Sequence, residues 1–316
     1  MRVEWRDDVR RWSHRAARLL PPIGRLAEQR DTLARECDDL RQQLEEREAT
    51  AVHVEYPIHP AVRDWRGTAG GDALHRLIAD GDERYLALLD KAAATAEQLA
   101  SLTVEATDDP TVPFWNNGWL PPVDGIVLTH LLQEQRPRTY LEIGSGNSTK
   151  FARHAIRTAG LDTRIVSIDP QPRAEIDSIC DLVVRAGLES PATLEQFRRL
   201  EPGDVVFFDG SHYCFQNSDV TAFFLELLAE IPAGCPYGVH DIFLPDDYPA
   251  EWLERFYNEQ YVLAAWILGG SAGDDVLLPA WYVSSRPQFD PARKALLDAS
   301  GAGPETHGGA FWMRRA

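Results

Sequence analysis

The chain has 316 residues, of which 44% are hydrophobic, and its 32 Lys and Arg residues face 49 Asp and Glu residues, for a formal net charge of −17. This length and apolar content allow one large domain with a sizeable core and an appendage. The acidic balance argues against nucleic acid as a partner, because nucleic-acid-binding surfaces concentrate Lys and Arg. A small molecule, a saccharide or a peptide fits better as the substrate.

The cysteines and the distribution of apolar residues indicate the compartment. No C-x-x-C spacing occurs, so neither a zinc site nor a disulfide framework is predicted for Cys37, Cys180, Cys214 and Cys235. The N-terminus has no apolar stretch of signal length, and no run of about 18 apolar residues could form a membrane span. We therefore expect a cytoplasmic protein with reduced cysteines.

Residues 1–50 are rich in Arg, Glu, Leu and Ala and predict a long amphipathic helix that starts after the Pro-Pro pair at 21–22. Its leucine seam, with seven-residue spacing and one further step of four, comprises Leu26, Leu33, Leu40 and Leu44. The seam is shorter than the three or four heptads of a clear coiled coil. Two interpretations stay open: the helix packs on its own domain, or it joins copies of the chain into a homo-oligomer.

Residues 51–109 are predicted to form a helical cap or linker. The prolines of Val54–Pro60 end the first helix, since proline removes a donor and disfavours helix in the preceding residue. Gly67–Gly71 extends the loop, and Asp72–Leu102 has the spacing of one or two helices that could cover the catalytic domain.

The stretch Asp108–Asp124 mixes aromatic rings, prolines and amides. Flat apolar surfaces beside amide donors and acceptors suit the wall of a pocket for a polar organic ligand. The residues predicted to contact substrate are Trp115, Asn116, Asn117 and Trp119. The alternative is a rigid entry loop at the sheet edge. A helix over Gly125–Gln133 then leads into the first strand, and the main domain is predicted to span residues 110–316.

From residue 139 onward, short apolar runs alternate with helical patterns, which predicts a doubly wound α/β fold with a mostly parallel sheet. The predicted strands are Thr139–Ile143, Ile165–Ile168, Leu182–Arg185, Asp204–Asp209, Tyr237–Phe243, Val276–Ser284 and Ala310–Arg314. The predicted helices are Phe151–Ala159, Ala174–Ile179, Ala192–Leu200, Asp219–Ile231 and Glu251–Leu268. Ligands in such sheets bind beyond the carboxyl ends of the strands, which places Gly144, Asp169, Asp209 and His240 along one rim.

The stretch Tyr140–Lys150, YLEIGSGNSTK, combines a strand, a glycine turn and the first turn of a helix. Gly144 and Gly146 let the backbone turn tightly and approach a ligand, and Ser148 or Thr149 can cap the helix. The free backbone N–H groups of the helix start face the ligand. The third glycine of the dinucleotide fingerprint is absent, which favours a mononucleoside over a nicotinamide dinucleotide.

An acid at the end of the next strand, Asp169, stands where such folds bind ribose hydroxyls. Glu142-x-Gly144-x-Gly146 followed by this acid resembles motif I and its successor in class I S-adenosylmethionine-dependent methyltransferases. The resemblance covers about residues 110–316. It implies a Rossmann-like sheet of seven strands that ends in an antiparallel pair, with residues 1–50 as a helical extension. It also implies S-adenosylmethionine as the cofactor, bound by Glu142, Gly144, Ser145, Gly146, Ser148, Asp169 and Asp209.

Two further strand ends carry polar side chains. Val205–Phe208 delivers Asp209 to the rim and the following turn presents His212, a carboxylate and an imidazole suited to proton transfer or metal binding. The alternative is that Asp209 caps the next helix or binds the amine of the cofactor. The next strand delivers His240 and Asp241, and with Asp209 they could hold a divalent ion.

These elements, DGSH and HD, resemble metal-dependent O-methyltransferases of the class I fold, in the branch that methylates sugars and natural products. Those enzymes bind magnesium with acids after the fourth and fifth strands. His240 departs from that pattern, so magnesium, a softer ion and no metal at all stay open. The resulting hypothesis is methylation of a hydroxyl on a small molecule or saccharide, with His212 as the base. Asp209 and Asp241, with His240, would hold the acceptor oxygen directly or through an ion that lowers its pKa.

Two rival functions stay open. One is a nucleotide-dependent oxidoreductase on a related sheet, which the missing third glycine and the His/Asp rim disfavour. The other is a non-catalytic interaction protein that keeps the fold and recruits partners through residues 1–50; intact Gly144, Gly146, Asp169 and His212 argue against such decay.

Overall fold

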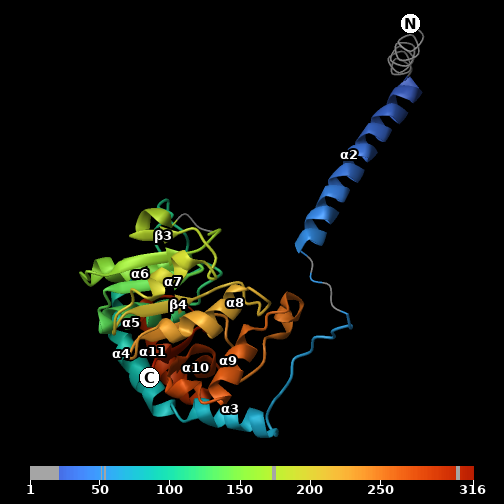
Figure 1. The fold of residues 1–316 in the computed structure, drawn as a ribbon. Helices are drawn as coiled ribbons and strands as arrows, with labels where there is room; N and C mark the ends of the chain where they lie inside the picture. Colours follow the sequence, from blue (N-terminus) through green and yellow to red (C-terminus); the bar gives the residue numbers. More distant parts are fainter. Residues whose placement is uncertain (1–20, 51, 53–54, 173–175, 304–306) are drawn as a thin grey trace. The chain divides into compact units, whose positions relative to one another are not determined.

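The computed structural model describes residues 21–50, 52, 55–172, 176–303 and 307–316. The chain forms two compact units, Met1–His59 and Pro60–Ala316. The described part of the first unit is mainly the predicted long helix, α2 (Pro21–Thr50; Figure 1). Its leucines at 26, 33 and 40 are 65%, 59% and 63% exposed, and the side chain of Leu44 lies outside the described residues. Assembly through this helix stays a prediction.

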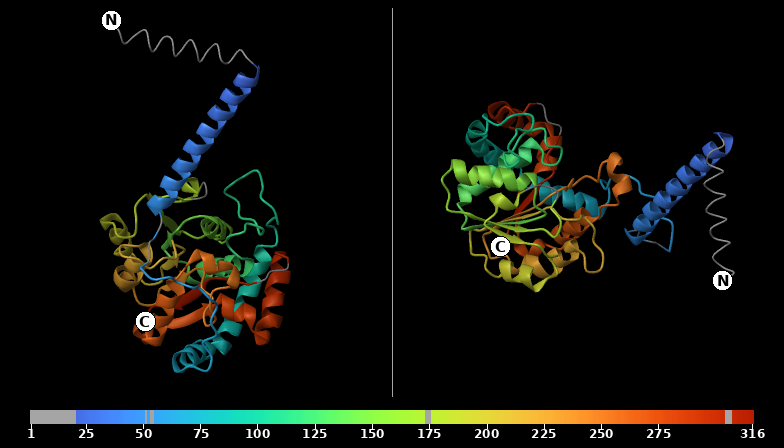
Figure 2. Two further views of the ribbon diagram at one scale, coloured as in Figure 1. Left: turned by 90° about the vertical axis from the view of Figure 1, so that its right-hand side faces the viewer. Right: turned by 90° about the horizontal axis from the view of Figure 1, so that it is seen from above.

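The second unit contains a sheet of seven strands in the order β3-β2-β1-β4-β5-β7-β6 (Figures 1 and 2). The strands β1 to β5 run parallel, and β7 is antiparallel to both β5 and β6. The strands are β1 (Thr139–Ile143), β2 (Arg164–Ile168), β3 (Leu182–Val184), β4 (Val205–Phe208), β5 (Pro236–Val239), β6 (Asp275–Pro279) and β7 (Phe311–Arg314). The predicted doubly wound fold with an antiparallel terminal pair is confirmed.

The strand register explains why the functional rim forms. Ile143 pairs with Ile168 on one side and with Phe208 on the other, and Phe208 pairs with Val239. The last residues of β1, β2, β4 and β5 therefore lie at one level. Each residue that follows a strand end leaves the sheet at the same edge, as predicted for ligand sites of parallel sheets.

The two aromatic residues of β4 show that the sheet has a core on both faces. Successive side chains of a strand point to opposite faces. Phe207 stacks on Trp312 of β7 with ring centroids 5.3 Å apart, and Phe208 stacks on Phe223 with centroids 4.4 Å apart. All four rings are fully buried. Burial on both faces explains why the strands are continuous apolar runs.

The helices of residues 60–109 belong to the same compact unit as the sheet. They are α3 (Ala69–Ala79), which packs against α9 (Glu259–Leu268), and α4 (Asp82–Gln98), which packs against α5 (Pro122–Gln135) and α11 (Asp290–Ser300). The compact unit that contains the sheet begins at Pro60. No residue of α3 or α4 lines the cavity described below, and their role as a cap stays a prediction.

The remaining helical segments are α6 (Asn147–Thr158), η1 (Asp177–Ile179), α7 (Pro191–Phe197), α8 (Asp219–Ala222) with its continuations η2 (Phe223–Leu227) and η3 (Leu228–Glu230), η4 (Ala250–Arg255), η5 (Ser271–Gly273), α10 (Ala280–Ser285) and η6 (Pro287–Phe289). Among the described residues, no helix combines the length and the apolar character needed to cross a bilayer.

Two predicted elements are wrong. The strand expected at Val276–Ser284 ends at Pro279 and continues as α10, consistent with the missing N–H of proline, which cannot join a strand ladder. The single helix expected at Glu251–Leu268 is broken, because Phe256 has a left-handed backbone with φ of 55° that no right-handed helix can contain. This break separates η4 from α9.

Candidate active site

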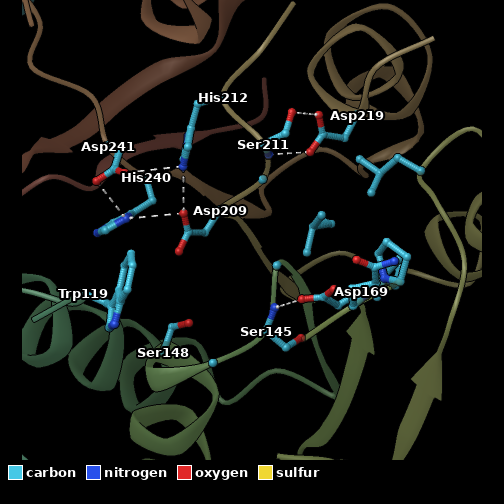
Figure 3. A pocket seen from close by; sticks show the side chains of 18 of the residues that line it. Trp119, Ser145, Ser148, Asp169, Asp209, Ser211, His212, Asp219, His240 and Asp241 are labelled. Atoms are coloured by element: carbon cyan, nitrogen blue, oxygen red, sulfur yellow. Dashed lines mark hydrogen bonds and ion pairs between the residues drawn. The ribbon is translucent and has the colours of Figure 1, made fainter. Parts of the chain in front are cut away.

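A cavity of about 430 Å³ lies at the carboxyl ends of β1, β2, β4 and β5 (Figure 3). Its lining includes most of the residues predicted from the sequence: Gly144, Ser145, Gly146, Ser148, Asp169, Asp209, His212, His240, Asp241 and Trp119. The structure thus brings together residues that lie 122 positions apart in the chain at most, from Trp119 to Asp241.

The two glycines of the loop after β1 have different roles. Gly144 has φ of 76°, and a Cβ there would lie 1.6 Å from the carbonyl oxygen of Asp209. Glycine is therefore required for the close approach of this loop to the end of β4, and not only for a ligand. A Cβ at Gly146 would meet nothing within 4 Å, so this backbone is open toward the cavity.

Hydrogen bonds from buried side chains hold the start of α6 on the side away from the cavity. Thr149 Oγ1 accepts from the Gly146 N–H at 2.9 Å, so Thr149 takes the capping role and Ser148 lines the cavity. Thr149 Oγ1 in turn donates to the fully buried Glu142, which also accepts from the Tyr140 hydroxyl at 2.7 Å. Burial raises the pKa of Glu142 to about 7. Glu142 does not line the cavity, and its contact with the cofactor stays a prediction.

Asp169 is held by backbone groups at the mouth of the second strand. Its Oδ2 accepts from the Ser145 N–H at 3.1 Å, and its Oδ1 accepts from the Gln171 N–H at 2.7 Å. Each carboxylate oxygen can accept more than one hydrogen bond. Asp169 therefore keeps acceptor capacity toward the cavity (Figure 3), and ribose binding at this residue stays a prediction.

The turn after β4 presents His212 in a left-handed backbone with φ of 65°. This conformation costs a non-glycine residue on the order of 1–3 kcal/mol, so other contacts must hold it. On one side Ser211 donates to Asp219 through its N–H at 2.6 Å and its Oγ at 2.5 Å. On the other side the Asn258 N–H donates to the His212 carbonyl at 3.0 Å. Ser218 caps α8, so the alternative of Asp209 as that cap is excluded.

Two imidazoles and two carboxylates meet at the rim (Figure 3). His212 Nε2 lies 3.5 Å from Asp209 Oδ1 and 3.4 Å from Asp241 Oδ2. His240 Nδ1 lies 3.6 Å from Asp209 Oδ1 and 3.4 Å from Asp241 Oδ1. One ligand atom from each of Asp209, His240 and Asp241 lies within 4.8 Å of the others, a spacing compatible with a single ion.

Two buried carboxylates that the sequence analysis missed hold the far side of each imidazole. Glu259 Oε2 lies 2.9 Å from His212 Nδ1, and Asp124 Oδ2 lies 3.3 Å from His240 Nε2. Asp124 also accepts from the N–H groups of Gly309 and Ala310 at 2.7 and 3.1 Å. A carboxylate only accepts, so the facing imidazole nitrogens hold protons. This leaves His212 Nε2 and His240 Nδ1 directed at the rim.

The sequence gives little indication that Asp124 and Glu259 contact the imidazoles. Asp124 lies 116 positions before His240, and Glu259 lies 47 positions after His212. The only signal for Glu259 is an acid at the start of the apolar segment EQYVLAAWIL, where acids favour a helix N-terminus. Glu259 is fully buried, and its Oε1 has no hydrogen-bond partner among the described residues.

The charges of the rim favour protonated imidazoles. Burial alone would lower the pKa of His212, but the hydrogen bond and charge of Glu259, followed by the charges of Asp241 and Asp209, raise it to about 9. Burial likewise opposes protonation of His240, whereas Asp209 and Asp241 raise its pKa well above 6.5. Burial raises the pKa of Asp241. A positive charge placed between Asp209 and Asp241 would offset their negative charges and so lower the pKa of both His212 and His240.

The predicted substrate wall is mostly structural. Trp115 is 4% exposed and packs on Phe151, with ring centroids 5.4 Å apart. Asn116 donates to Glu105 at 2.9 Å outside the cavity lining, and the Asn117 amide closes its own loop. Of the four predicted residues only Trp119 lines the cavity, and substrate contact by the four stays a prediction. Arg255, the last residue of η4, and Tyr257, between η4 and α9, also line it.

Comparison with known proteins gives one family match. Residues 141–242 match the model of a methyltransferase domain family, and this range contains the glycine loop, Asp169, Asp209, His212 and the His240–Asp241 pair. No sequence among the curated proteins matches the chain.

Solved structures of low overall similarity also match. CmcI with Mg and SAM is 14% identical with a TM-score of 0.38, over 62% of this chain and 72% of that one. An O-methyltransferase from Bacillus cereus in complex with SAH is 16% identical with a TM-score of 0.37, over 78% of this chain and 100% of that one. MycE from the mycinamycin biosynthetic pathway, with Mg, SAH and mycinamycin VI, is 14% identical with a TM-score of 0.34, over 59% and 47%.

Proposed function

We propose that this chain, which carries a class I S-adenosylmethionine-dependent methyltransferase domain, methylates a hydroxyl oxygen of a small-molecule or saccharide acceptor. The observation that supports an oxygen acceptor is the relay at the rim. Glu259 holds Nδ1 of His212 at 2.9 Å, and Nε2 of His212 faces Asp209 and Asp241 across the cavity from the glycine loop. An alcohol must lose its proton during methylation, and a held imidazole is the usual group for that task.

The loop after β1 and Asp169 form the cofactor side. When bound, S-adenosylmethionine supplies an electrophilic methyl group on a sulfonium. The open backbone at Gly146 and the carboxylate of Asp169 line this side, and we assign the nucleoside to them. The lining carboxylates, among them Asp169 and Glu189, suit a cationic cofactor by charge.

His212 acts as the general base through Nε2. Glu259 keeps the proton on Nδ1 and stabilises the imidazolium that forms when Nε2 accepts the acceptor proton. Asp209 and Asp241 orient the hydroxyl toward this nitrogen, since both lie within 3.5 Å of it. Such a positioned base contributes about 10²–10⁴-fold to the rate.

The rim also fits a divalent ion. Asp124 accepts the Nε2 proton of His240, so Nδ1 faces the cluster and would bind an ion once it has lost its own proton. A carboxylate behind an imidazole is the usual outer arrangement of a metal-bound histidine. Asp209, His240 and Asp241 would hold the ion, which when bound lowers the pKa of a coordinated hydroxyl. The imidazole favours iron or zinc over magnesium.

Calorimetry with S-adenosylhomocysteine and with NAD, followed by transfer of a labelled methyl group to hydroxylated small molecules and saccharides, tests the proposal. We expect S-adenosylhomocysteine to bind, NAD not to bind, and the label to appear on oxygen. Binding of NAD alone would support a nucleotide-dependent oxidoreductase. Cofactor binding without transfer to any acceptor would support a non-catalytic protein. Assays in EDTA with and without added divalent ions test the metal: full activity in EDTA would remove it from the mechanism.

A further inference from the structure

Among the described residues that line the cavity, a single side chain is of Lys or Arg type, that of Arg255, the last residue of η4. The lining carboxylates are Asp169, Glu189, Asp209, Asp219 and Asp241. Both this lining and the chain as a whole, with its net charge of −17, are acidic. We therefore ask what the positive charge of Arg255 could bind.

Aromatic rings hold Arg255 in place. Its guanidinium carbon lies 4.0 Å from the centre of the Trp252 ring and 5.5 Å from that of Tyr257, distances typical of cation–π contacts. The Tyr213 hydroxyl donates to the Arg255 carbonyl at 2.7 Å. The Tyr257 ring lies 4.5 Å from the imidazole of His212. The guanidinium and the proposed base therefore share one aromatic wall.

Arg255 differs from three partly buried arginines of the domain, each of which forms a short ion pair with an aspartate. Arg153, Arg286 and Arg315 form ion pairs of 2.5, 3.0 and 2.6 Å with aspartates. Arg255 has no such short ion pair among the described residues; its charge acts on Asp241, and its side chain contacts Tyr257. A guanidinium has five donors, so Arg255 keeps capacity for a carboxylate or phosphate, which guanidinium groups bind through paired hydrogen bonds.

The place of Arg255 in the fold assigns it to the acceptor. It follows β5, and β5 is separated from β1 by β4 in the sheet order, whereas the glycine loop and Asp169 follow β1 and β2. We propose that Arg255 binds an anionic group, a carboxylate or a phosphate, on the methyl acceptor while the acceptor hydroxyl lies at His212. The acidic lining repels that group elsewhere in the cavity, so Arg255 also fixes the orientation of the acceptor. This inference rests on the proposed function.

Matched pairs of probes test the inference on the full chain loaded with S-adenosylhomocysteine. The pairs are 3,4-dihydroxybenzoate and 3,4-dihydroxybenzamide, glucuronate and glucose, and glucose 6-phosphate and glucose. Ligand-observed NMR titrations give each affinity, and the second and third pairs distinguish carboxylate from phosphate. In at least one pair we expect the anion to bind about 10-fold more tightly than its neutral partner, the scale of a hydrogen bond to a charged group.

Three variants test whether the affinity difference between the anionic and the neutral probe depends on Arg255. Arg255→Gln should abolish it, and Arg255→Lys should keep part of it. Arg157→Gln changes an exposed arginine of α6 outside the cavity lining and should leave it intact. The affinity for S-adenosylhomocysteine should be unchanged in all three variants, which also verifies that they are folded.

Several results would overturn the inference. Equal affinities within every pair would show that no anion is recognised. A loss in Arg255→Gln that is equal for both members of a pair would assign Arg255 to charge balance for Asp241. A loss of S-adenosylhomocysteine affinity with the pair difference intact would assign it to the cofactor. Failure of the wild-type protein to bind S-adenosylhomocysteine would contradict the proposed function instead.

Discussion

The cofactor side and the acceptor side of the cavity are built in different ways. The cofactor side comes mainly from one stretch, Tyr140–Asp169, and presents glycines, backbone N–H groups and one carboxylate. The acceptor side assembles side chains from segments far apart in the chain, namely the turn after β4, the end of β5 and the segment from η4 to α9, with α5 behind them. We therefore expect cofactor binding and proton transfer to be separable by mutation.

The backbone shows the same difference. On the cofactor side the left-handed position belongs to a glycine, Gly144, for which it carries little strain. On the acceptor side His212 and Asp241 adopt φ of 65° and 56°, each at a cost on the order of 1–3 kcal/mol. Contacts from α9 hold His212 in this conformation. The acceptor side thus depends on its neighbours, whereas the cofactor side is largely local.

The largest expected effect is that of His212→Ala. Loss of the base should slow methyl transfer by about 10²–10⁴-fold, while the affinity for S-adenosylmethionine stays within a small factor of wild type, because His212 lies on the acceptor side. Single-turnover rates and calorimetry measure the two quantities. Near-wild-type transfer to the true acceptor would refute the role of His212 and with it the separation of the two sides.

Glu259→Gln tests whether a buried residue outside the cavity lining controls the acceptor side. Since Glu259 is the main group that raises the pKa of His212 to about 9, that pKa should fall in the variant, as measured by NMR titration of the imidazole. A base works unprotonated, so metal-free wild type should gain activity as pH rises through about 9, and the variant should reach its plateau at lower pH.

The same variant should be about 10–100-fold slower, the usual cost of removing a carboxylate that orients a histidine. Glu254→Gln, at an exposed glutamate of η4, is the matched control and should behave as wild type. An unchanged pH profile together with a reduced rate would indicate that Glu259 supports only the fold.

Asp169→Ala tests the cofactor side. It should weaken S-adenosylhomocysteine binding by roughly 1.5–3 kcal/mol, the scale of hydrogen bonds to a charged group, and leave the rate at saturating cofactor largely intact. Asp162→Ala, at an exposed acid of the same αβ unit, serves as the control in calorimetry. If a folded Asp169 variant bound S-adenosylhomocysteine with unchanged affinity, the assignment of the ribose to this residue would be wrong.

The smallest effect is expected from removal of the first unit. A chain that starts at Pro57 keeps the whole unit Pro60–Ala316, so turnover and cofactor affinity should stay within about twofold of wild type. Sedimentation shows whether the exposed leucines of α2 join copies of the chain. Loss of turnover with cofactor affinity and oligomeric state retained would reveal a catalytic role for this helix.

The sequence by itself determined the sheet and the cofactor side. Apolar runs such as Val205–Phe208 mark buried parallel strands, and parallel pairing brings their ends to one edge. The positions of Asp169, Asp209 and His240 at that edge follow from these local patterns. The glycine loop could be recognised from one stretch of sequence, although its contacts with Asp169 and with the end of β4 come from the fold.

Only the tertiary structure decided the partners on the acceptor side. Asp124 and Glu259 reach their imidazoles across 116 and 47 positions, and no local period encodes such contacts. The break at Phe256 turns a predicted helix into two segments and brings Arg255 to the cavity. Trp115, by contrast, turns into the core against Phe151. Composition predicts which side chains could form a pocket, but the path of each loop determines which way they face, because that path is fixed by packing against distant elements.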